Sequence, residues 1–413
     1  MNKDNAIPYA RQNISEDDIL AVEKVLKSDF LTQGSKVTEF EKKLSIKTHA
    51  KYCVTTNSAT SALHLACLAL DLGPGDILWT SPNTFVASAN VSIMCGAEID
   101  FIDIDPKTYN ICVDTLCEKL INANKIGKLP KIVMPVHFAG QPCDMKKIKE
   151  LSKQYGFYII EDASHAIGAK YLNTPKYALS DKISSLDHGG HVAVGSCKYS
   201  DITVFSFHPV KIITSGEGGC ALTNSYQISE KIKILRSHGV TQNLSDFSTR
   251  HDDEIWNYQQ IYLGYNYRMT DIQAALGISQ LSRIENFLKR RYSIASIYNE
   301  KLINLPIDLP WQDPNVFSAL HLYPITLSSE TTKNLHSFSQ KGLYKSLWEN
   351  GIKVNLHYIP VYLHPYYETK GFKKEYCPQA EKYYKSALSI PIYPDLTIEM
   401  QDRVVNAIKE YFQ

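Results

Sequence analysis

Apolar and polar residues follow two regular patterns over the first two thirds of the chain. Short apolar runs at 52–56, 77–80, 98–103, 132–136, 157–161, 203–207 and 220–223 have the length and composition of buried strands. Apolar residues at helical spacing occupy 15–28, 36–46, 58–70, 84–94 and 144–155, and a capping box at 15–18 opens the first of these segments. Strands that alternate with helices of this length indicate βαβ units, so we predict a mostly parallel sheet covered by helices on both faces.

The pattern changes after Thr270. A long helix is predicted over 271–302, followed by strands at 321–327 and 353–357 and by helices at 339–350, 380–388 and 397–411. A chain of 413 residues is too long for one ordinary core, so two domains are expected. We therefore predict an α/β protein with a large domain at 1–285, including an N-terminal helical segment, and a smaller C-terminal α/β domain at 286–413.

The polar segment 170–200 interrupts the alternation of strands and helices. We expect it to form a loop or a short hairpin between two core strands. It contains the run Asp187-His188-Gly189-Gly190-His191, whose two histidines could suggest a metal site. The run has no clear third ligand at metal-site spacing, so a loop is the favoured interpretation and no metal is predicted.

Composition narrows the class of protein. The hydrophobic fraction of 44% and the charged fraction of 21% are ordinary for a soluble enzyme, and a net charge of +1 gives no general attraction to nucleic acid or membrane. No apolar run approaches the ~20 residues that span a bilayer, and the N-terminus lacks a signal-peptide core. The nine cysteines form no CxxC pair and lie mostly in apolar runs, as reduced, buried thiols do. We expect a cytoplasmic protein.

Lys211 has the most informative surroundings in the chain. It follows the apolar run 203–207 and precedes the turn Gly216-Glu217-Gly218-Gly219, so it is expected to project from a rigid sheet edge into a cleft. A lysine amine can hold a carbonyl cofactor as an imine, and burial lowers its pKa enough to make it nucleophilic. A surface lysine in a loop is the ordinary alternative.

Other segments supply the groups that a pyridoxal phosphate site needs. The stretch 56–62 follows a strand and opens a helix, whose free N–H groups favour a phosphate, and Ser206 could add a hydroxyl donor. Asp162 ends a strand and could keep a pyridine nitrogen protonated, with His165 near the ring hydroxyl and Phe85 stacked on the ring. Each feature alone has an ordinary explanation: a capped helix, a strand-end carboxylate, a structural histidine and a core phenylalanine.

Taken together, these features resemble the fold-type I pyridoxal phosphate enzymes and, within them, the DegT/DnrJ/EryC1/StrS sugar aminotransferase family. The resemblance covers nearly the whole chain. The matching motifs are Asn57-Ser-Ala-Thr-Ser-Ala62, Glu161-Asp-Ala-Ser-His-Ala-Ile-Gly-Ala169, Phe205-Ser-Phe-His-Pro-Val-Lys211, Gly216-Glu-Gly-Gly219, Gly264-Tyr-Asn-Tyr-Arg-Met-Thr-Asp271 and Pro391-Ile-Tyr-Pro394.

The resemblance implies a role for each matching residue. Lys211 would form the imine with pyridoxal 5′-phosphate and act as the acid and base, while Asp162 would pair with the ring nitrogen. Phe85 would stack on the ring, His165, where the family often has glutamine, would face the ring hydroxyl, and Ala59, Thr60 and Ser206 would hold the phosphate. Asn266 would reach the phosphate of the neighbouring subunit, so the resemblance implies a homodimer with shared active sites.

Two further stretches, 198–214 and 256–266, are similar to the members of the family that act in pseudaminic acid biosynthesis. This similarity implies that L-glutamate aminates UDP-2-acetamido-2,6-dideoxy-β-L-arabino-hexos-4-ulose, giving UDP-4-amino-4,6-dideoxy-N-acetyl-β-L-altrosamine and 2-oxoglutarate. Arg236, His238 and Arg268 are candidates for the glutamate carboxylates or the sugar diphosphate, because arginine forks suit either anion, and His321 and Tyr323 are candidates for contact with the sugar. Ion pairs at a dimer interface explain the charged members of this set equally well.

Three alternative functions stay open. The substrate could be another nucleotide-linked 4-ketosugar, such as a GDP- or dTDP-sugar. A dehydratase of the same family would be expected to carry histidine in place of Lys211. A non-catalytic binding protein with this fold is the third alternative, although no basic stripe indicates nucleic acid as its partner.

Overall fold

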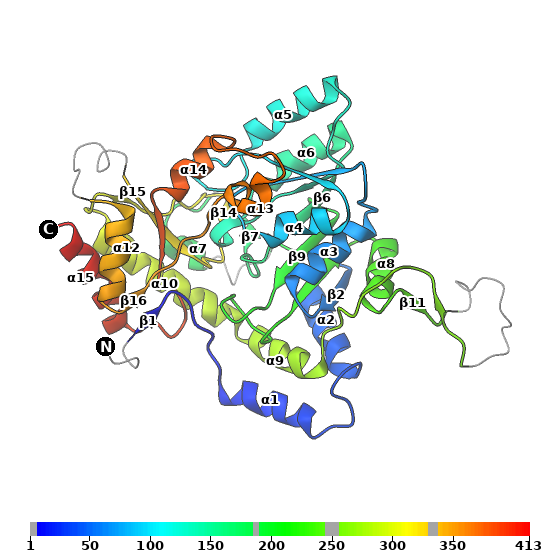
Figure 1. Cartoon of the computed structure of the whole chain (residues 1–413). Helices are drawn as coiled ribbons and strands as arrows, with labels where there is room; N and C mark the ends of the chain where they lie inside the picture. The colour runs from blue at the N-terminus through cyan, green and yellow to red at the C-terminus, as the bar shows by residue number, and fades with distance from the viewer. Residues whose placement is uncertain (1–5, 185–189, 244–255, 329–337) are drawn as a thin grey trace.

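The computed structural model describes residues 6–184, 190–243, 256–328 and 338–413, which form two lobes (Figure 1). The larger lobe is built on a seven-stranded sheet with the order β2-β10-β9-β6-β5-β3-β4. Its strands are β2 (Tyr52–Thr56), β3 (Ile77–Thr80), β4 (Glu98–Phe101), β5 (Ile132–Met134), β6 (Tyr158–Asp162), β9 (Ile202–Ser206) and β10 (Gly219–Thr223). β10 runs antiparallel to both of its neighbours and the remaining pairs are parallel, so the predicted mostly parallel sheet is confirmed.

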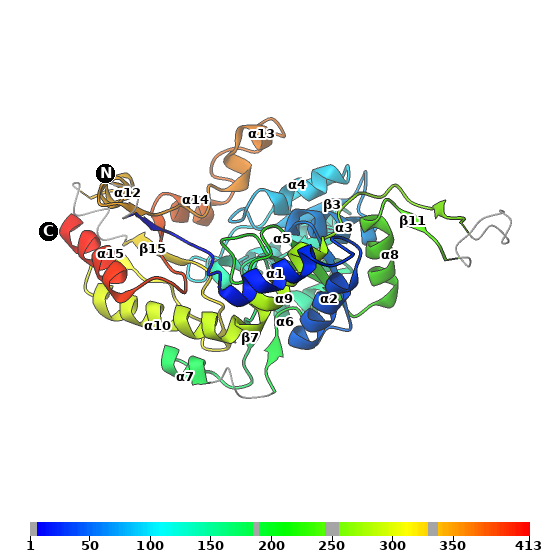
Figure 2. The ribbon, with the colours of Figure 1, turned by 90° about the horizontal axis from the view of Figure 1, so that it is seen from below.

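Helices pack on both faces of this sheet (Figures 1 and 2). They are α2 (Ser35–Thr48), α3 (Ala59–Ala69), α4 (Ala87–Met94), α5 (Val113–Lys125), α6 (Met145–Tyr155), α8 (Tyr226–Arg236) and α9 (Asp271–Ser282), and α1 (Glu16–Leu26) packs against α9. Helix α1 begins where the capping box predicts, with the Asp18 carboxylate accepting the backbone N–H of Ser15 at 2.9 Å. Helix α5 was not predicted, although its buried Leu116, Leu120 and Ala123 have helical spacing.

The smaller lobe contains the predicted C-terminal α/β layer. Its antiparallel sheet has the order β13-β15-β17 and consists of β13 (Ile307–Asp308), β15 (Tyr323–Leu327) and β17 (Ala387–Ile390). Helices α10 (Ile284–Leu302), α12 (Gln340–Glu349) and α15 (Ile398–Tyr411) pack around it, and α10 runs along this lobe toward α9 (Figure 2). The strand β1 (Ile7–Pro8) pairs in parallel with β16 (Ile352–Lys353), so the start of the described chain joins the C-terminal lobe. A domain boundary after residue 285 stays a prediction.

Three predicted elements are corrected by the structure. The helix expected over 271–302 is divided into α9 and α10 at Arg283, whose side chain forms an ion pair with Asp18 of α1. The helix expected over 380–388 is the shorter α14 (Pro378–Tyr384), and the chain then enters the strand β17. The strand expected over 353–357 is the shorter β16, which ends at Lys353, and beyond it Asn355 forms an isolated bridge to Ser389.

The segment 170–200 contains the predicted short hairpin and, in addition, a helix. The strands β7 (Lys170–Tyr171) and β8 (Val192–Ala193) pair as a short hairpin, and β7 also pairs with β14 (Val316–Phe317). Between them lies the helix α7 (Leu179–Ser184), whose buried Lys182 donates to the backbone oxygen of Val316 at 2.7 Å. Asp187 and His188 lie outside the described residues.

Two global features follow from the part of the chain that the structure describes. Within it, no helix has the length and apolarity that crossing a membrane requires, and no group of three or more His, Cys, Asp or Glu side chains is arranged to hold a metal ion. The nine cysteines are free thiols, and most of them are buried, as predicted.

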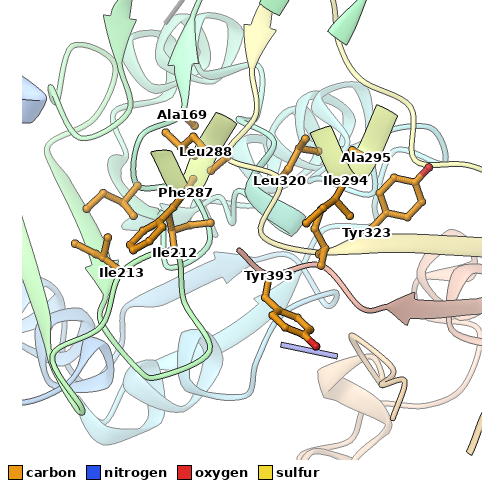
Figure 3. Packing of buried hydrophobic residues seen from close by; sticks show 14 of the residues in the cluster. Ala169, Ile212, Ile213, Phe287, Leu288, Ile294, Ala295, Leu320, Tyr323 and Tyr393 are labelled. Carbon is orange, nitrogen blue, oxygen red and sulfur yellow. The ribbon is translucent and has the colours of Figure 1, made fainter. Parts of the chain in front are cut away.

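The apolar core also anchors the segment around Lys211. Ile212 and Ile213, which follow this lysine directly, are buried in a cluster that includes Phe287 and Leu288 of α10 (Figure 3). Burying two such side chains stabilises the local backbone by about 1.5–3 kcal/mol each. The position of Lys211 is therefore tied to the helix that links the two lobes.

Candidate active site

A cavity of about 970 Å³ lies at the carboxyl ends of the parallel strands. This is the edge at which open α/β sheets bind ligands. Eight of the residues predicted from the sequence line it: Ala59, Thr60, Phe85, Asp162, His165, Ser206, Lys211 and His321. The structure thus brings together side chains from segments that are far apart in the sequence.

Lys211 enters the cavity from the turn after β9. Its side chain is half-buried, and its backbone N–H donates to the carbonyl oxygen of His208 at 2.9 Å. Burial lowers the pKa of the Lys211 amine to about 8, against the opposing effect of the negative Asp162, which raises it. About a tenth of this amine is therefore neutral, and able to accept a proton, at pH 7.

The neutral fraction of Lys211 is expected to set how fast the residue reacts with a small aldehyde. Because the pKa is about 8, the rate should rise about tenfold per pH unit below that pH and level off above it. The measurement is peptide mass spectrometry of the protein after brief treatment with formaldehyde and cyanoborohydride between pH 6 and 10. Free Nα-acetyl-lysine in the same tube has a side-chain pKa of ~10.4, so its reaction rate should still increase with pH at pH 9. If the reaction rates of the two amines depended on pH in the same way, the lowered pKa of Lys211 would be contradicted.

Asp162 is the last residue of β6 and is held from several sides. Its side chain is only 5% exposed. Oδ1 accepts the backbone N–H of Ser164 at 3.1 Å and the Ser164 hydroxyl at 2.6 Å, and Oδ2 accepts the Ser88 hydroxyl at 2.6 Å. Backbone hydrogen bonds to Pro135 and from His137 fix the residue against β5. The carboxylate therefore has a defined orientation at the cavity wall.

The N-terminus of α3 forms another wall of the cavity. Ser58 caps the helix by accepting the N–H of Ser61 at 3.1 Å, and Ala59 and Thr60 follow in the first turn. Gly219 of β10 packs directly against this turn, since a Cβ at this position would lie 2.5 Å from the nitrogen of Ala59. Small residues and the positive end of the helix dipole make this turn suited to a phosphate.

Aromatic rings occupy the remaining walls. Phe85 is 60% exposed although it is apolar, and its ring belongs to the lining of the cavity. His165 is buried, with its Nε2 3.1 Å from the Tyr358 hydroxyl and its ring centroid 4.4 Å from that of His321. Burial first, and then the positive charge of Lys211, hold the pKa of His165 well below its usual range. The imidazole of His165 is therefore neutral at physiological pH.

Two more histidines on the cavity wall behave in the same way. Burial, with a further contribution from Lys211, lowers the pKa of His357 to about 3. Burial, followed by neighbouring His165, keeps the pKa of His321 well below its usual range. These rings can donate and accept hydrogen bonds without adding positive charge to the cavity.

Two predicted substrate contacts lie elsewhere. Arg236 donates through Nη1 to Glu41 Oε1 at 2.7 Å and to the backbone oxygen of Thr55 at 2.7 Å, so its charge is already paired. Tyr323 is buried in the smaller lobe, where its hydroxyl donates to Asn299 and its ring packs against Tyr298. Neither side chain lines the cavity of its own chain, because tertiary partners that the local pattern does not reveal hold both of them.

Three other predicted contacts lie on the surface beside the cavity. His238 and Asn266 are exposed and Arg268 is half-buried, and the backbone N–H of His238 donates to Tyr265 at 2.9 Å. The amide of Asn57 donates to the backbone oxygen of Asn266 at 3.3 Å, which places this loop next to the start of α3. Their contacts with ligands stay predictions.

The family comparison settles the relationship that the motifs indicate. The sequence matches the model of the DegT/DnrJ/EryC1/StrS aminotransferase family over residues 12–409. The chain belongs to this family. The resemblance noted from the motifs is therefore confirmed.

Individual relatives agree with this family assignment. The chain is 38% identical to an uncharacterized protein of Methanocaldococcus jannaschii, over 99% of this chain and 98% of that protein. It is 36% identical to the UDP-4-amino-4,6-dideoxy-N-acetyl-beta-L-altrosamine transaminase of Campylobacter jejuni serotype O:2, over 95% and 94%. Among solved structures it is similar to Helicobacter pylori PseC, an aminotransferase involved in the biosynthesis of pseudoaminic acid, with a TM-score of 0.83, 28% identity and 99% of both chains covered.

Membership of this aminotransferase family implies pyridoxal 5′-phosphate as the cofactor. The cavity fits each part of that molecule. The first turn of α3, against which Gly219 leaves no room for a side chain, suits the phosphate, and the amine of Lys211 suits the aldehyde. The buried carboxylate of Asp162 suits the ring nitrogen, and the exposed ring of Phe85 suits the face of the pyridine.

Most of the cavity lining was not among the predicted site residues. The additional lining residues include Tyr9, Thr84, Ser88, Asn355, His357 and Tyr358. Thr84 and Ser88 are four positions apart, but α4 begins only at Ala87, so the helical spacing of the sequence does not predict their contact. Tyr358 has no local signal, because it belongs to the C-terminal lobe and reaches the cavity through a backbone hydrogen bond to Asn83 at 3.1 Å.

Proposed function

We propose that this chain is a pyridoxal phosphate-dependent transaminase. It transfers the amino group of L-glutamate to the C4 ketone of a nucleotide-linked 4-keto-6-deoxyhexose. The observation that carries the proposal is the amine of Lys211, with its pKa near 8, in one cavity with Asp162 and the first turn of α3, in a chain of this aminotransferase family. An amine that titrates near the working pH is suited to exchange protons in both directions.

In this proposal different cavity residues bind different parts of the cofactor. Ala59, Thr60 and Ser206 hold the phosphate, Asp162 pairs with the ring nitrogen, and Phe85 covers the ring. When bound, pyridoxal phosphate supplies an electron-withdrawing ring that takes up the electron pair of the bond broken next to the amino group. His165, neutral and hydrogen-bonded to Tyr358, faces the ring hydroxyl.

Lys211 carries the proton transfers. In the first half of the reaction its Nζ would remove the proton from Cα of glutamate; the amino group would stay with the bound cofactor, water would supply the keto oxygen, and 2-oxoglutarate would leave. In the second half the same Nζ returns a proton to C4 of the sugar, which becomes an amine-bearing carbon. One side chain serves both halves because its pKa lies close to the working pH, and because Ile212 and Ile213 anchor its backbone.

For the sugar we propose UDP-2-acetamido-2,6-dideoxy-β-L-arabino-hexos-4-ulose, with UDP-4-amino-4,6-dideoxy-N-acetyl-β-L-altrosamine as the product. The support is the 36% identity to the Campylobacter jejuni transaminase named for this product, together with the similarity to PseC. A relative at this level of identity could differ in its nucleotide, so GDP- and dTDP-linked ketosugars are the alternatives to be tested.

We further propose that the active unit is a homodimer. Glutamate carries two carboxylates and the sugar nucleotide a diphosphate, yet among the described residues that line the cavity Lys211 is the sole lysine or arginine. A second copy could contribute Asn266, Arg268 and His238, which lie beside the start of α3. The arm formed by β11 (Val240–Thr241) and β12 (Gln259–Gln260) projects from the large lobe near this loop, and it carries exposed Trp256 and Tyr258 (Figure 1).

The proposal is tested by assaying UDP-, GDP- and dTDP-linked 4-ketosugars side by side with L-glutamate. Release of 2-oxoglutarate and formation of the amino sugar, followed by mass spectrometry, should occur with the UDP-linked N-acetylated sugar. We expect its kcat/KM to exceed those of the other two by about a hundredfold or more, because a site that hydrogen-bonds its substrate rejects analogues strongly. Turnover of glutamate with a different nucleotide sugar would support the transaminase activity but contradict the proposed sugar substrate. Absence of 2-oxoglutarate with every sugar would contradict both the transaminase activity and the proposed substrate.

A further inference from the structure

A line of hydroxyl groups leads from α4 to the cavity carboxylate. Thr84 Oγ1 lies 2.8 Å from Ser88 Oγ, and Ser88 Oγ lies 2.6 Å from Asp162 Oδ2. All three residues line the cavity, yet they are almost inaccessible, with exposed fractions of 2%, 0% and 5%. Hydrogen bonds in such a dry environment are costly to leave unmade, so the line has a defined geometry.

The direction of these hydrogen bonds follows from the chemistry of the groups. An ionised carboxylate accepts and does not donate, so the single hydroxyl proton of Ser88 points to Asp162. Ser88 Oγ must then accept from Thr84, whose hydroxyl is the donor of the pair. The relay therefore runs in one direction, from Thr84 through Ser88 to Oδ2 of Asp162.

Ser88 is the second residue of α4, and its hydroxyl makes a long-range contact. A serine in a helix can bond back to the carbonyl one turn earlier. Ser88 instead donates to a residue 74 positions later, at the end of β6. The same short stretch carries Phe85, so one turn of the chain presents both an exposed aromatic ring and the hydroxyl that orients the carboxylate.

The two oxygens of Asp162 are held differently. Oδ1 receives both of its donors from Ser164, which lies two positions further along the same chain segment. Oδ2 receives its donor from Ser88 on α4. The contact to Ser88 therefore prevents rotation of the carboxylate plane relative to the cavity, which the local contacts with Ser164 alone would allow.

We propose that Ser88 is a positioning residue that aims the Asp162 carboxylate at the ring nitrogen of the cofactor, with Thr84 as the second member of the relay. This inference rests on the proposed binding of pyridoxal phosphate in the cavity. Ser88 acts through Asp162, so its effect must disappear when the ligand offers no ring nitrogen to the carboxylate. That condition separates positioning from a general role in folding.

The test compares the binding of two ligands to apo-protein. One is pyridoxal phosphate, and the other is 1-deazapyridoxal phosphate, in which a carbon replaces the ring nitrogen. The Kd of each ligand is measured by equilibrium dialysis for wild type, Ser88→Ala, Thr84→Val and Thr84→Ser. Ser92→Ala serves as the matched control, because Ser92 is equally buried in α4 but donates to the backbone oxygen of Glu98, outside the cavity lining.

Ser88→Ala is expected to weaken the binding of pyridoxal phosphate about tenfold to a hundredfold, as loss of a hydrogen bond to a charged group does. The Kd of the deaza analogue should change less than about threefold. Thr84→Val, which keeps the side-chain volume, should weaken the binding of pyridoxal phosphate about threefold to tenfold. Thr84→Ser, which keeps the hydroxyl, and Ser92→Ala should match wild type for both ligands.

Equal weakening of both ligands by Ser88→Ala and Thr84→Val would overturn the inference, since it would indicate a purely structural role. An unchanged Kd for both ligands in both variants would overturn it as well. If wild type bound neither ligand, the proposed function would fail first and the inference with it. Tight binding to wild type without discrimination by Ser88→Ala would leave the proposed function intact and reject only the relay.

Discussion

Replacing Lys211 with alanine is expected to lower the rate of both half-reactions by about 10⁴-fold, the upper range for loss of a positioned acid and base. Alanine removes the amine that, in the proposed function, takes and returns the proton at Cα of glutamate and at C4 of the sugar. Lys211→Arg should be almost equally inactive, because a guanidinium keeps the positive charge but does not release its proton near neutral pH. Single-turnover formation of 2-oxoglutarate measures the effect in the first half-reaction.

Lys182 provides a matched control for this prediction. It is a buried lysine of α7 whose pKa burial likewise lowers to about 8, but its amine donates to the backbone oxygens of Asp313 and Val316, outside the cavity lining. Lys182→Ala should lower the melting temperature and leave the rate per folded molecule within about twofold of wild type, since it removes no group from the cavity. Retention of more than about one hundredth of the wild-type rate by Lys211→Ala would contradict the assigned role.

The strands and the strand-end residues of the site could be predicted from the sequence because their signals are local. Apolar runs bounded by turns locate β2, β3, β6 and β9, and parallel strands bring their carboxyl ends to one edge of the sheet. Lys211 and Asp162 each follow or end such a run, so their convergence follows from the topology. The first turn of α3 was predictable for the same reason.

The residues that escaped prediction depend on contacts between distant parts of the chain. Arg283 interrupts the helical pattern without a glycine or proline, because its side chain is held by Asp18 and Asn13 near the N-terminus. Tyr358 reaches the cavity only because the C-terminal lobe packs against Asn83. Arg236 has the charge for a substrate contact, but Glu41, 195 positions earlier, already neutralises it. Local periodicity contains no information about such partners.

Glu161→Ala is expected to lower the free energy of unfolding by about 3–5 kcal/mol, the usual cost of removing one partner from a buried, hydrogen-bonded pair. Glu161 precedes Asp162 in β6 and is 3% exposed. Its Oε2 lies 2.7 Å from His137 Nε2, and its Oε1 accepts the hydroxyls of Thr203, at 3.0 Å, and Ser200. The backbone N–H of Cys143 donates to His137 Nδ1, so the proton of this ring is on Nε2 and faces Glu161.

The loss is measured by urea unfolding of the apo-protein followed by circular dichroism. Glu349→Ala is the control, because Glu349 pairs with Lys345 at 3.7 Å on the exposed face of α12 and should contribute only about 0–1 kcal/mol. His137→Ala should be costly as well, and the double variant should lose less than the sum of the two single variants. Additive losses would show that the two side chains do not stabilise one another.

The pH dependence gives a second check on Glu161. Burial alone raises the pKa of this carboxyl group, but the hydrogen bonds from His137, Ser200 and Thr203 outweigh burial and lower it below the ordinary value of 4.5. A lowered pKa in the folded state means that the stabilisation is complete above pH 4.5 and is lost as the pH falls through the lowered value. The difference in stability between wild type and Glu161→Ala should therefore narrow in acid.

The same variant should also reduce activity, because consecutive residues of a strand point to opposite faces and share one backbone. Glu161 anchors β6 on the face away from the cavity, and Asp162 presents its carboxylate on the other face. Releasing the anchor allows the strand end to shift, and a small displacement of Asp162 weakens its contact with the cofactor. Glu161→Ala should therefore weaken the binding of pyridoxal phosphate more than the binding of its deaza analogue. Unchanged binding of both ligands in a measurably destabilised variant would separate the buried pair from the active site.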